Sequence, residues 1–397
     1  MEALRFVWND SLARYDFGPG HPMTPDRLEL TTRLCRELGL LSHAGVHVTD
    51  ADPVPDPVLA TVHTEPYLEA VRAASVGGRS RAGRAAGAFG LGTDDVPVFR
   101  GMHEASARIV GGTLDVALAV WNGEAGHGIN IAGGMHHAMP ERASGFCVYN
   151  DLAIAVRALL RAGAQRVAYV DVDVHHGDGM ERIFWDDPRV LTVSLHETGE
   201  ALFPGSGHPG QLGGPGAEGT AVNVALPPGT GDAGWLRAFH AVVPPLVRAF
   251  QPQILISQHG CDTHELDPLG HLTLSVDAQR AVGIAVHELA HELCAGRWVG
   301  VGGGGYAVVE VVPRAWAHLV GIAAHHAVEP SAEVPEPWRR HVRELFGLRA
   351  PRFMTDGAPV SWREWSGGGD PSDAVDRAVA ETRHAVFPRH GLDPLAG

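Results

Sequence analysis

The segment of this 397-residue chain that is richest in reactive side chains runs from Asp171 to Gly179 and reads DVDVHHGDG. It directly follows an apolar run at 166–170. If the strand persists, Asp171, Asp173 and His175 alternate onto one face. Ionisable groups are costly to bury together unless a cation or partner compensates them. Helix-capping aspartates at a polar strand end are the alternative, but they account poorly for this density.

Three other apolar runs also end in segments that could contribute to a site. These segments read GGMHH at 133–137, QHGCD at 258–262 and GGGGY at 302–306. In an open α/β sheet the ligand site lies outside the carboxyl ends of the strands, so the fold would gather all four segments. Taken singly, these segments have ordinary explanations: a His pair at the surface, an Asp in a turn or a Tyr in the core. If these explanations held for all of them, the meeting of the four segments at one edge would be a coincidence.

Two carboxylates and an imidazole form a ligand set that suits Zn²⁺ or Fe²⁺ with open positions. Asp173, His175 and Asp262 match the three protein ligands of a catalytic zinc site. Such a metal lowers the pKa of bound water toward ~7 and polarises a carbonyl group. His136 and His137 are the candidates for the general base.

Two acidic residues and a phenol complete the candidate site. Asp171 and Asp178 could fix the tautomers of the two histidines. The Tyr306 hydroxyl, on its glycine-rich loop, could reach a developing oxyanion. Together these groups predict hydrolysis of an amide bond.

Short apolar runs that alternate with helical patterns must position these groups. Strands are expected at 4–8, 127–131, 166–172, 190–195, 220–226, 253–258 and 297–302, and helices at 24–39, 64–74, 102–121, 149–162, 232–250, 276–295 and 307–324. This order predicts a three-layer α/β/α fold with a central, mostly parallel sheet. Glycine- and proline-rich stretches at 75–100 and 199–219 are expected to be functional loops. We expect a main domain at 1–326 and an extension at 327–397 that packs partly on it.

Composition narrows the classes of partner. A net charge of −15 disfavours nucleic acid and anionic membrane as partners. Four widely spaced cysteines without a C-x-x-C motif fit a reducing cytosol, and no apolar run reaches ~18 residues. A cytoplasmic protein is therefore expected, and its oligomeric state stays open.

The ordered motifs GGxHHA, SGFCxYND (144–151), DVDVHHGDG, GCD and GGGGY resemble those of the class I histone deacetylase superfamily, the zinc-dependent deacetylases of the arginase/deacetylase fold. The phrases LGTDD (91–95), GMHEAS (101–106) and QHGCDTH (258–264) are most similar to the bacterial acetoin-utilisation branch. The similarity spans about residues 5–320 and does not cover the tail.

The resemblance implies a role for each matching position. Zinc would be held by Asp173, His175 and Asp262. His137 would be the general base, with Asp178 behind it, and His136 would pair with Asp171. Tyr306 would bind the scissile carbonyl. A potassium-like cation would be held by Ser194 with backbone groups of Asp171, Asp173 and His175. An acetyl-lysine tunnel would be lined by Gly145, Phe146, Phe203, Leu269 and Gly304. Asp94, or Asp95 one residue on, would lie at the rim of this tunnel, and Arg27 would be buried behind the active site.

The implied substrate is an acetylated protein, in the acetoin branch an acyl-CoA synthetase. The absence of lysine clusters, through which eukaryotic relatives bind corepressors, argues against a histone role. A small acetylated amine is the main alternative, because an acetylpolyamine amidohydrolase uses the same metal site. A ureohydrolase would leave the Tyr306 loop unexplained, and a non-catalytic binding protein would have lost catalytic positions that are present here.

One further motif stands apart from this set. His287-Glu288-Leu289-Ala290-His291 fits the HExxH pattern of zinc proteases, with Glu310 as a conceivable third ligand. Glu310 follows a loop that the deacetylase motif already explains. We therefore expect the two histidines to lie on a surface face of a helix.

Overall fold

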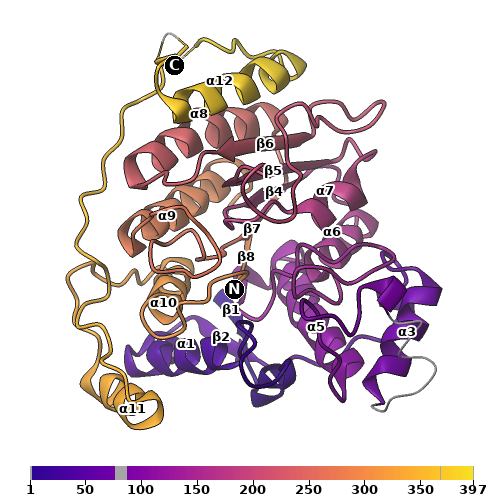
Figure 1. The fold of residues 1–397 in the computed structure, drawn as a ribbon, viewed down its shortest axis with the longest axis vertical. Helices are drawn as coiled ribbons and strands as arrows, with labels where there is room; N and C mark the ends of the chain where they lie inside the picture. Colours follow the sequence, from indigo (N-terminus) through magenta and orange to yellow (C-terminus); the bar gives the residue numbers. More distant parts are fainter. Residues whose placement is uncertain (1, 77–86, 367, 397) are drawn as a thin grey trace.

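A computed structural model describes residues 2–76, 87–366 and 368–396, which form one eight-stranded sheet between two layers of helices (Figure 1). The strands lie in the order β2-β1-β3-β8-β7-β4-β5-β6, and every neighbouring pair is parallel. Their bounds are β1 Glu2–Val7, β2 Val46–Thr49, β3 Ala125–Asn130, β4 Val167–Asp171, β5 Val190–Glu197, β6 Ala221–Leu226, β7 Ile254–Gln258 and β8 Trp298–Val301. The predicted three-layer α/β/α architecture is confirmed.

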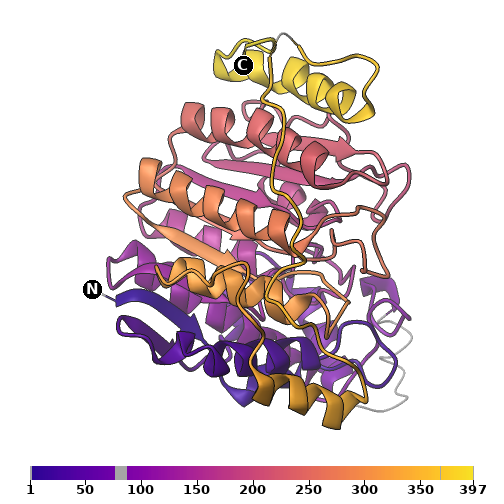
Figure 2. The same cartoon turned by 90° about the vertical axis from the view of Figure 1, so that its left-hand side faces the viewer.

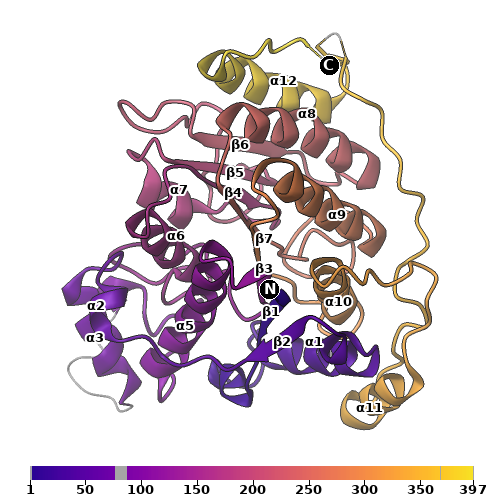
Figure 3. The same cartoon turned by 180° about the vertical axis from the view of Figure 1, so that it is seen from behind.

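Helices cover both faces of the sheet, as two further views show (Figure 2, Figure 3). One layer contains α1 (Asp26–Glu37), α8 (Asp232–Phe250), α9 (Val276–Leu293) and α10 (Val312–Ala323). The other contains α5 (Met102–Trp121), α6 (Asp151–Arg161) and α7 (Asp178–Phe184), with α2 (Asp56–Leu59) and α3 (Glu65–Ser75) beyond it. Of the described residues, no helix combines the length and apolarity needed to cross a bilayer.

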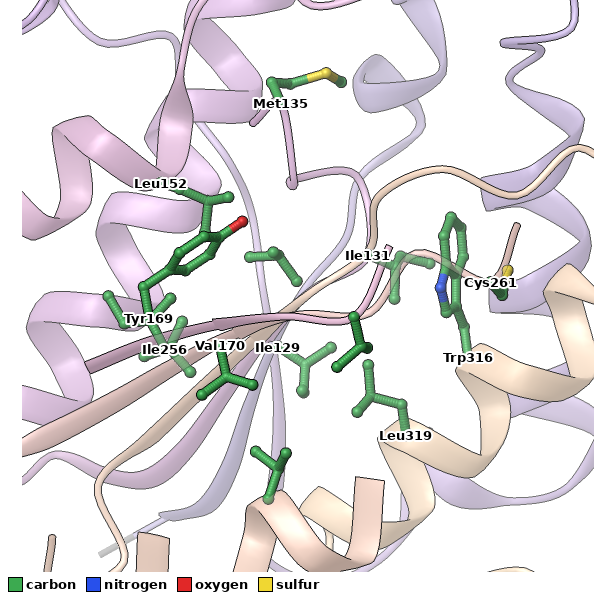
Figure 4. Packing of buried hydrophobic residues seen from close by; sticks show 14 of the residues in the cluster. Ile129, Ile131, Met135, Leu152, Tyr169, Val170, Ile256, Cys261, Trp316 and Leu319 are labelled. Atoms are coloured by element: carbon green, nitrogen blue, oxygen red, sulfur yellow. The ribbon is translucent and has the colours of Figure 1, made fainter. Parts of the chain in front are cut away.

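The central strands are buried on both sides, and β4 and β7 accordingly lack an apolar–polar alternation. Every residue of β4, β5 and β7 is buried. Figure 4 shows Tyr169, Val170 and Ile256 from these strands in the core, with Leu152 on one side and Leu319 on the other. This packed centre holds the carboxyl ends of the strands in fixed positions.

The structure differs from the sequence-based expectation at several elements. The edge strand β2 was not predicted, because it is only four residues long and half exposed. Nor were α7, α11 (Glu336–Phe346) and α12 (Ala374–Val386). The helix expected at 307–324 begins only at Val312, because Pro313 occupies its first turn, where a missing N–H costs nothing. Of the long loop expected at 75–100, residues 77–86 lie outside the described residues.

The segment after residue 327 contacts the domain at both of its ends. The Trp338 indole of α11 is buried and donates a hydrogen bond to the Leu30 carbonyl, 2.9 Å away. At the other end, α12 lies over α8 (Figure 1), and Thr382 Oγ1 donates to the Asn223 carbonyl over 2.7 Å. The boundary at residue 326 stays a prediction.

Candidate active site

The candidate site lies at the carboxyl ends of four adjacent strands, β3, β8, β7 and β4. Their last residues are Asn130, Val301, Gln258 and Asp171. The four segments that sequence patterns singled out follow these strands, so the sheet brings them together. This is the crevice in which open α/β sheets bind ligands.

Asp173, His175 and Asp262 form the innermost cluster. His175 Nδ1 lies 3.1 Å from Asp173 Oδ1 and 3.1 Å from Asp262 Oδ2, and all three side chains are buried. These three atoms converge closely enough to share one ion. Burial, and then repulsion from Asp173, raise the pKa of Asp262 to about 7. Such a pair of buried carboxylates calls for a cation between them.

The other carboxylate oxygens in this cluster are held by the protein itself. Asp173 Oδ2 accepts hydrogen bonds from Gln258 Nε2 over 2.6 Å and from the Gly304 amide over 2.8 Å. Asp262 Oδ1 accepts from the Val174 amide over 2.9 Å. Each carboxylate therefore turns a single oxygen toward His175. Side chains fixed in this way are preorganised for a metal.

Glycine is required at two places where the backbone passes close to the carboxylates of the cluster: at Gly304 in the Tyr306 loop and at Gly260 before Asp262. A Cβ atom at Gly304 would collide with Asp262 Oδ2, and one at Gly260 would collide with Asp173 Oδ2. The backbone thus approaches the carboxylates as closely as a chain can. The donor set, its convergence and this cradle fit a divalent metal with nitrogen and oxygen ligands.

Two His–Asp pairs lie beside the cluster. His136 Nδ1 donates to Asp171 Oδ2 over 2.8 Å, and His137 Nδ1 donates to Asp178 Oδ1 over 2.7 Å. The two imidazole rings lie with their centroids 4.0 Å apart. In each pair the carboxylate fixes the proton on Nδ1 and leaves Nε2 toward the pocket.

The two histidines differ in charge. Burial lowers the pKa of His136, but Asp171 and Asp173 outweigh it and raise that pKa to about 9. Burial, and then the charge on His136, lower the pKa of His137 to about 4, against an opposing effect of Asp178. At neutral pH, His137 is therefore an unprotonated base beside a cationic neighbour.

Tyr306 faces this cluster from the glycine-rich loop. Its ring meets Phe146 edge-on, with the centroids 5.7 Å apart. Burial, and then the charges of Asp262 and Asp173, raise the pKa of its phenol well above the usual value, so the hydroxyl stays a donor. Behind it, Arg27 Nη1 donates to the carbonyls of Gly303 and Gly305 over 2.9 and 3.0 Å. Arg27 is thus buried behind the site and supports the loop.

A pocket of about 220 Å³ leads to the cluster. Its walls include five positions that the family resemblance singled out: Gly145, Phe146, Phe203, Leu269 and Gly304. Asp95 also lines the pocket, and its Oδ2 accepts a hydrogen bond from the Gly145 amide over 2.8 Å. Asp94 does not line the pocket and is exposed, so of the two adjacent aspartates it is Asp95 that lines the pocket.

The positions implied for a monovalent cation lie next to one another. Asp171 and Ser194 are register partners on β4 and β5. Ser194 Oγ is hydrogen-bonded to His196 Nδ1 over 2.8 Å, and Asp171 Oδ1 accepts from the Asp173 amide over 3.2 Å. The Gly177 amide also donates to Ser194 Oγ over 3.5 Å, so the Ser194 side chain lies beside the segment that follows β4.

Sequence patterns missed two carboxylates that shape the site. Asp267 Oδ2 accepts from the Tyr306 amide over 2.6 Å, and its Oδ1 accepts from the Leu269 amide over 3.0 Å. Asp151 Oδ1 accepts from the Met135 amide over 2.8 Å and so bends the loop that carries the two histidines. Asp151 lies within the SGFCxYND phrase, which could have drawn attention to it. A lone Asp267 in a loop carries no such signal.

Comparisons with known proteins agree with this geometry. The histone deacetylase domain family matches residues 21–323. The chain is 38% identical over 355 residues to the acetoin utilization protein AcuC of Bacillus subtilis (strain 168), covering 89% of this chain and 90% of that protein. It is 40% identical over 333 residues to the AcuC protein of Staphylococcus xylosus, covering 84% and 85% of the two chains.

Proposed function

The chain belongs to the histone deacetylase family, and from that premise we propose that it uses Zn²⁺ to remove acetyl groups from lysine side chains of proteins. Its reaction is hydrolytic deacetylation at an amide bond, and the family is metal-dependent. The proposal therefore concerns the identity of the metal and the class of acetylated substrate.

One observation carries the proposal. Two His–Asp pairs, one with a cationic and one with a neutral imidazole, and one phenol surround a three-ligand metal cluster that a pocket leads to. Amide hydrolysis needs a base, a donor for the developing oxyanion and an acid for the leaving amine. The site contains a group suited to each of these tasks.

The residues divide the work according to their charge. His137, neutral and held by Asp178, accepts a proton at Nε2 from the attacking water. His136, cationic beside Asp171, stabilises negative charge and can supply a proton to the departing amine. The Tyr306 hydroxyl donates to the carbonyl oxygen as its charge grows.

Asp173, His175 and Asp262 would hold the zinc, which when bound acidifies water and polarises the acetyl carbonyl. Two carboxylates and one imidazole also suit Fe²⁺, so the metal has to be measured in protein purified without added metal. We also propose that K⁺ binds at Ser194 and the backbone of Asp171, Asp173 and His175, as the family resemblance implies. The adjacency of β4 and β5 supports this second site.

The pocket supports an acetyl-lysine substrate. The Phe146 and Phe203 side chains both line it, and such apolar walls can bury the alkyl part of a lysine side chain. Asp95 lies where a rim carboxylate could accept a hydrogen bond from a substrate backbone amide. The relatives are named for acetoin utilization, and we propose the same metabolic setting here, in the cytoplasm.

Turnover of an acetyl-lysine peptide by the purified enzyme, with and without a chelator, tests this proposal. Tyr306→Phe should lower kcat by about 10²–10³-fold, the usual effect of removing one oxyanion donor. Its metal content, measured by mass spectrometry, should equal that of the wild type. Asp173→Ala should lose the metal as well as the activity.

Tyr149→Phe is the matched control, because this buried tyrosine contacts His103 rather than the pocket and its loss should spare activity. Full turnover by Tyr306→Phe would contradict the proposed chemistry. Acetylspermidine should be a poorer substrate than the peptide. The reverse preference would leave the assignment as a deacetylase intact but would indicate that the substrate is a small acetylated amine and not a protein.

A further inference from the structure

Among the described residues, a second group of metal-ligating side chains lies away from the pocket. It comprises His127, His287, His291 and His325, referred to here as the four-histidine cluster. His127 is in the first half of β3, while the catalytic segments follow the ends of the strands. His287 and His291 are in the last two turns of α9, and His325 follows α10. The cluster therefore lies toward the amino edge of the sheet, opposite the pocket.

The same ring atom of every histidine faces the others. His127 Nε2 lies 3.1 Å from His325 Nε2, 3.2 Å from His287 Nε2 and 3.2 Å from His291 Nε2. His287 and His291 Nε2 are also 3.2 Å apart. The ligand atoms of all four residues lie within 4.8 Å of one another.

Hydrogen bonding cannot satisfy this arrangement. An imidazole Nε2 carries either a proton or one lone pair, so each can take part in one good hydrogen bond. Four atoms can then form at most two bonds, although four close contacts exist. His127, His287 and His291 are all in mutual contact, so at least one pair among them must bring two donors or two acceptors face to face. A cation at the centre accepts all four lone pairs and removes the conflict.

The spacing of the nitrogen atoms fits a tetrahedral metal. Four ligands at the usual Zn–N distance of about 2.0–2.1 Å are separated by about 3.3–3.4 Å along the tetrahedron edges. Four of the six nitrogen pairs, at 3.1–3.2 Å, come close to this value, and the other two, His325 with His287 and with His291, lie within 4.8 Å. A square-planar site, as for Cu²⁺ or Ni²⁺, has no three mutually adjacent ligands, whereas the Nε2 atoms of His127, His287 and His291 are all 3.2 Å apart.

The surroundings hold the rings in place. His325 is the left-handed residue (φ 53°) that ends α10, where the His326 amide donates to the Gly321 carbonyl over 2.8 Å, so the helix end fixes the position of its backbone. The Trp298 ring meets His127 and His287 edge-on, each with centroids 5.6 Å apart. Gly296 closes over His291, where a side chain would crowd the ring at 3.1 Å.

We propose that the four-histidine cluster binds Zn²⁺ as a closed structural site that ties β3, α9 and the turn after α10 together. Four protein ligands leave no open position, so the site is not a second catalytic centre. His291 and His325 are exposed, which gives the ion a route from solvent. The HExxH pair thus takes part in metal binding without the open coordination that a protease requires.

Zinc counting on the untagged full-length chain tests this proposal. The protein is stripped with a chelator, reloaded with Zn²⁺ and gel-filtered, and the bound zinc is measured by mass spectrometry. His287→Ala/His291→Ala should bind one zinc per chain fewer than the wild type, and so should the exposed substitution His325→Asn. His326→Ala is the matched control, because His326 is also exposed and stacks on His43 instead.

The difference between variant and wild type does not depend on whether the catalytic site is loaded. Turnover of an acetyl-lysine peptide by His325→Asn should stay within about twofold of the wild type, as expected for a closed structural site. Co²⁺ loading gives a second readout, because wild type minus His325→Asn should show the visible bands of four-coordinate Co²⁺. Equal zinc content in the wild type, His325→Asn and the double variant would overturn the proposal.

Discussion

His137 donates its Nδ1 proton to Asp178 over 2.7 Å, and this carboxylate opposes the two influences that keep the imidazole neutral. Burial and the adjacent His136 cation both lower the pKa of His137, whereas Asp178 raises it. Asp178 therefore sets both the tautomer and the basicity of the proposed base.

Asp178→Asn should make His137 a weaker base. Removal of the negative charge destabilises the imidazolium, so the pKa of His137 falls and the acid limb of the pH–rate profile moves to lower pH. The loss of orientation should reduce kcat by roughly 10- to 100-fold. Steady-state kinetics from pH 3.5 to 8, a range that spans the pKa of about 4 for His137, measure both effects. An acid limb that moves to higher pH would contradict this assignment.

Asp267 should act on Tyr306 through the backbone. Asp267→Ala removes both acceptors, for the Tyr306 and Leu269 amides, whereas Asp267→Asn keeps one of them. We expect kcat to fall by roughly 10-fold or more in Asp267→Ala, because a displaced phenol no longer meets the oxyanion. Asp267→Asn should lie between this variant and the wild type.

The zinc content of both Asp267 variants separates this effect from loss of the metal. Asp267 is not among the three proposed ligands, so the metal should stay bound. Equal activity of Asp267→Ala and the wild type would show that the loop needs no such anchor. If zinc content and activity fell together, Asp267 would act mainly by supporting the metal site and not by positioning Tyr306.

The order of strands and helices was largely predictable because central strands such as β4 and β7 are buried on both faces and are apolar over most of their length. The proposed metal ligands were identifiable for a related reason. Asp173, His175 and Asp262 directly follow such strands, and the carboxyl ends of parallel strands meet at one edge. Local sequence and a general rule of topology were sufficient there.

Features that depend on how loops fold back were not predictable. Asp267 contacts Tyr306 across 39 positions of the chain, and neither neighbourhood indicates the other. The choice between Asp94 and Asp95 at the pocket rim stayed open, because two adjacent aspartates look equivalent in sequence. The HExxH pair was visible, but His127 and His325 join it from distant positions in unremarkable contexts.

The C-terminal segment should contribute to stability through a buried ion pair. Arg237 Nη2 on α8 donates to Asp376 Oδ2 on α12 over 3.0 Å, and the two side chains are 6% and 1% exposed. Asp376→Ala leaves the guanidinium buried without its partner, which costs about 3–5 kcal/mol of unfolding free energy. Denaturant unfolding of the full chain measures this loss.

Asp52→Ala is the control for this variant, because its side chain is 98% exposed and its pairing with Arg108 is loose at 3.7 Å. Little change is expected there. If Asp376→Ala unfolds at the same denaturant concentration as the wild type, α12 adds no stability to the domain through this pair.

His63 should make the fold sensitive to mild acid. Its Nδ1 donates to the Met139 carbonyl over 3.1 Å and its Nε2 accepts from the Asn150 amide over 3.0 Å, which fixes a neutral ring. Burial lowers its pKa to about 4 from about 6.5. Between these values the unfolded chain binds a proton that the folded chain does not, so stability falls as the pH drops from 6.5 to 4, by up to about 3 kcal/mol.

His63→Gln should remove this dependence while keeping a donor and an acceptor at the same place. Unfolding free energies of the wild type and the variant, measured at intervals from pH 7 to 4, give the comparison. The slope of unfolding free energy against pH should be steeper for the wild type than for the variant in this window. The difference should correspond to at most one bound proton, because only one titrating group differs. Other buried histidines contribute equally to both proteins and cancel. Parallel slopes would mean that His63 is protonated in the folded state, in conflict with its hydrogen bond from Asn150.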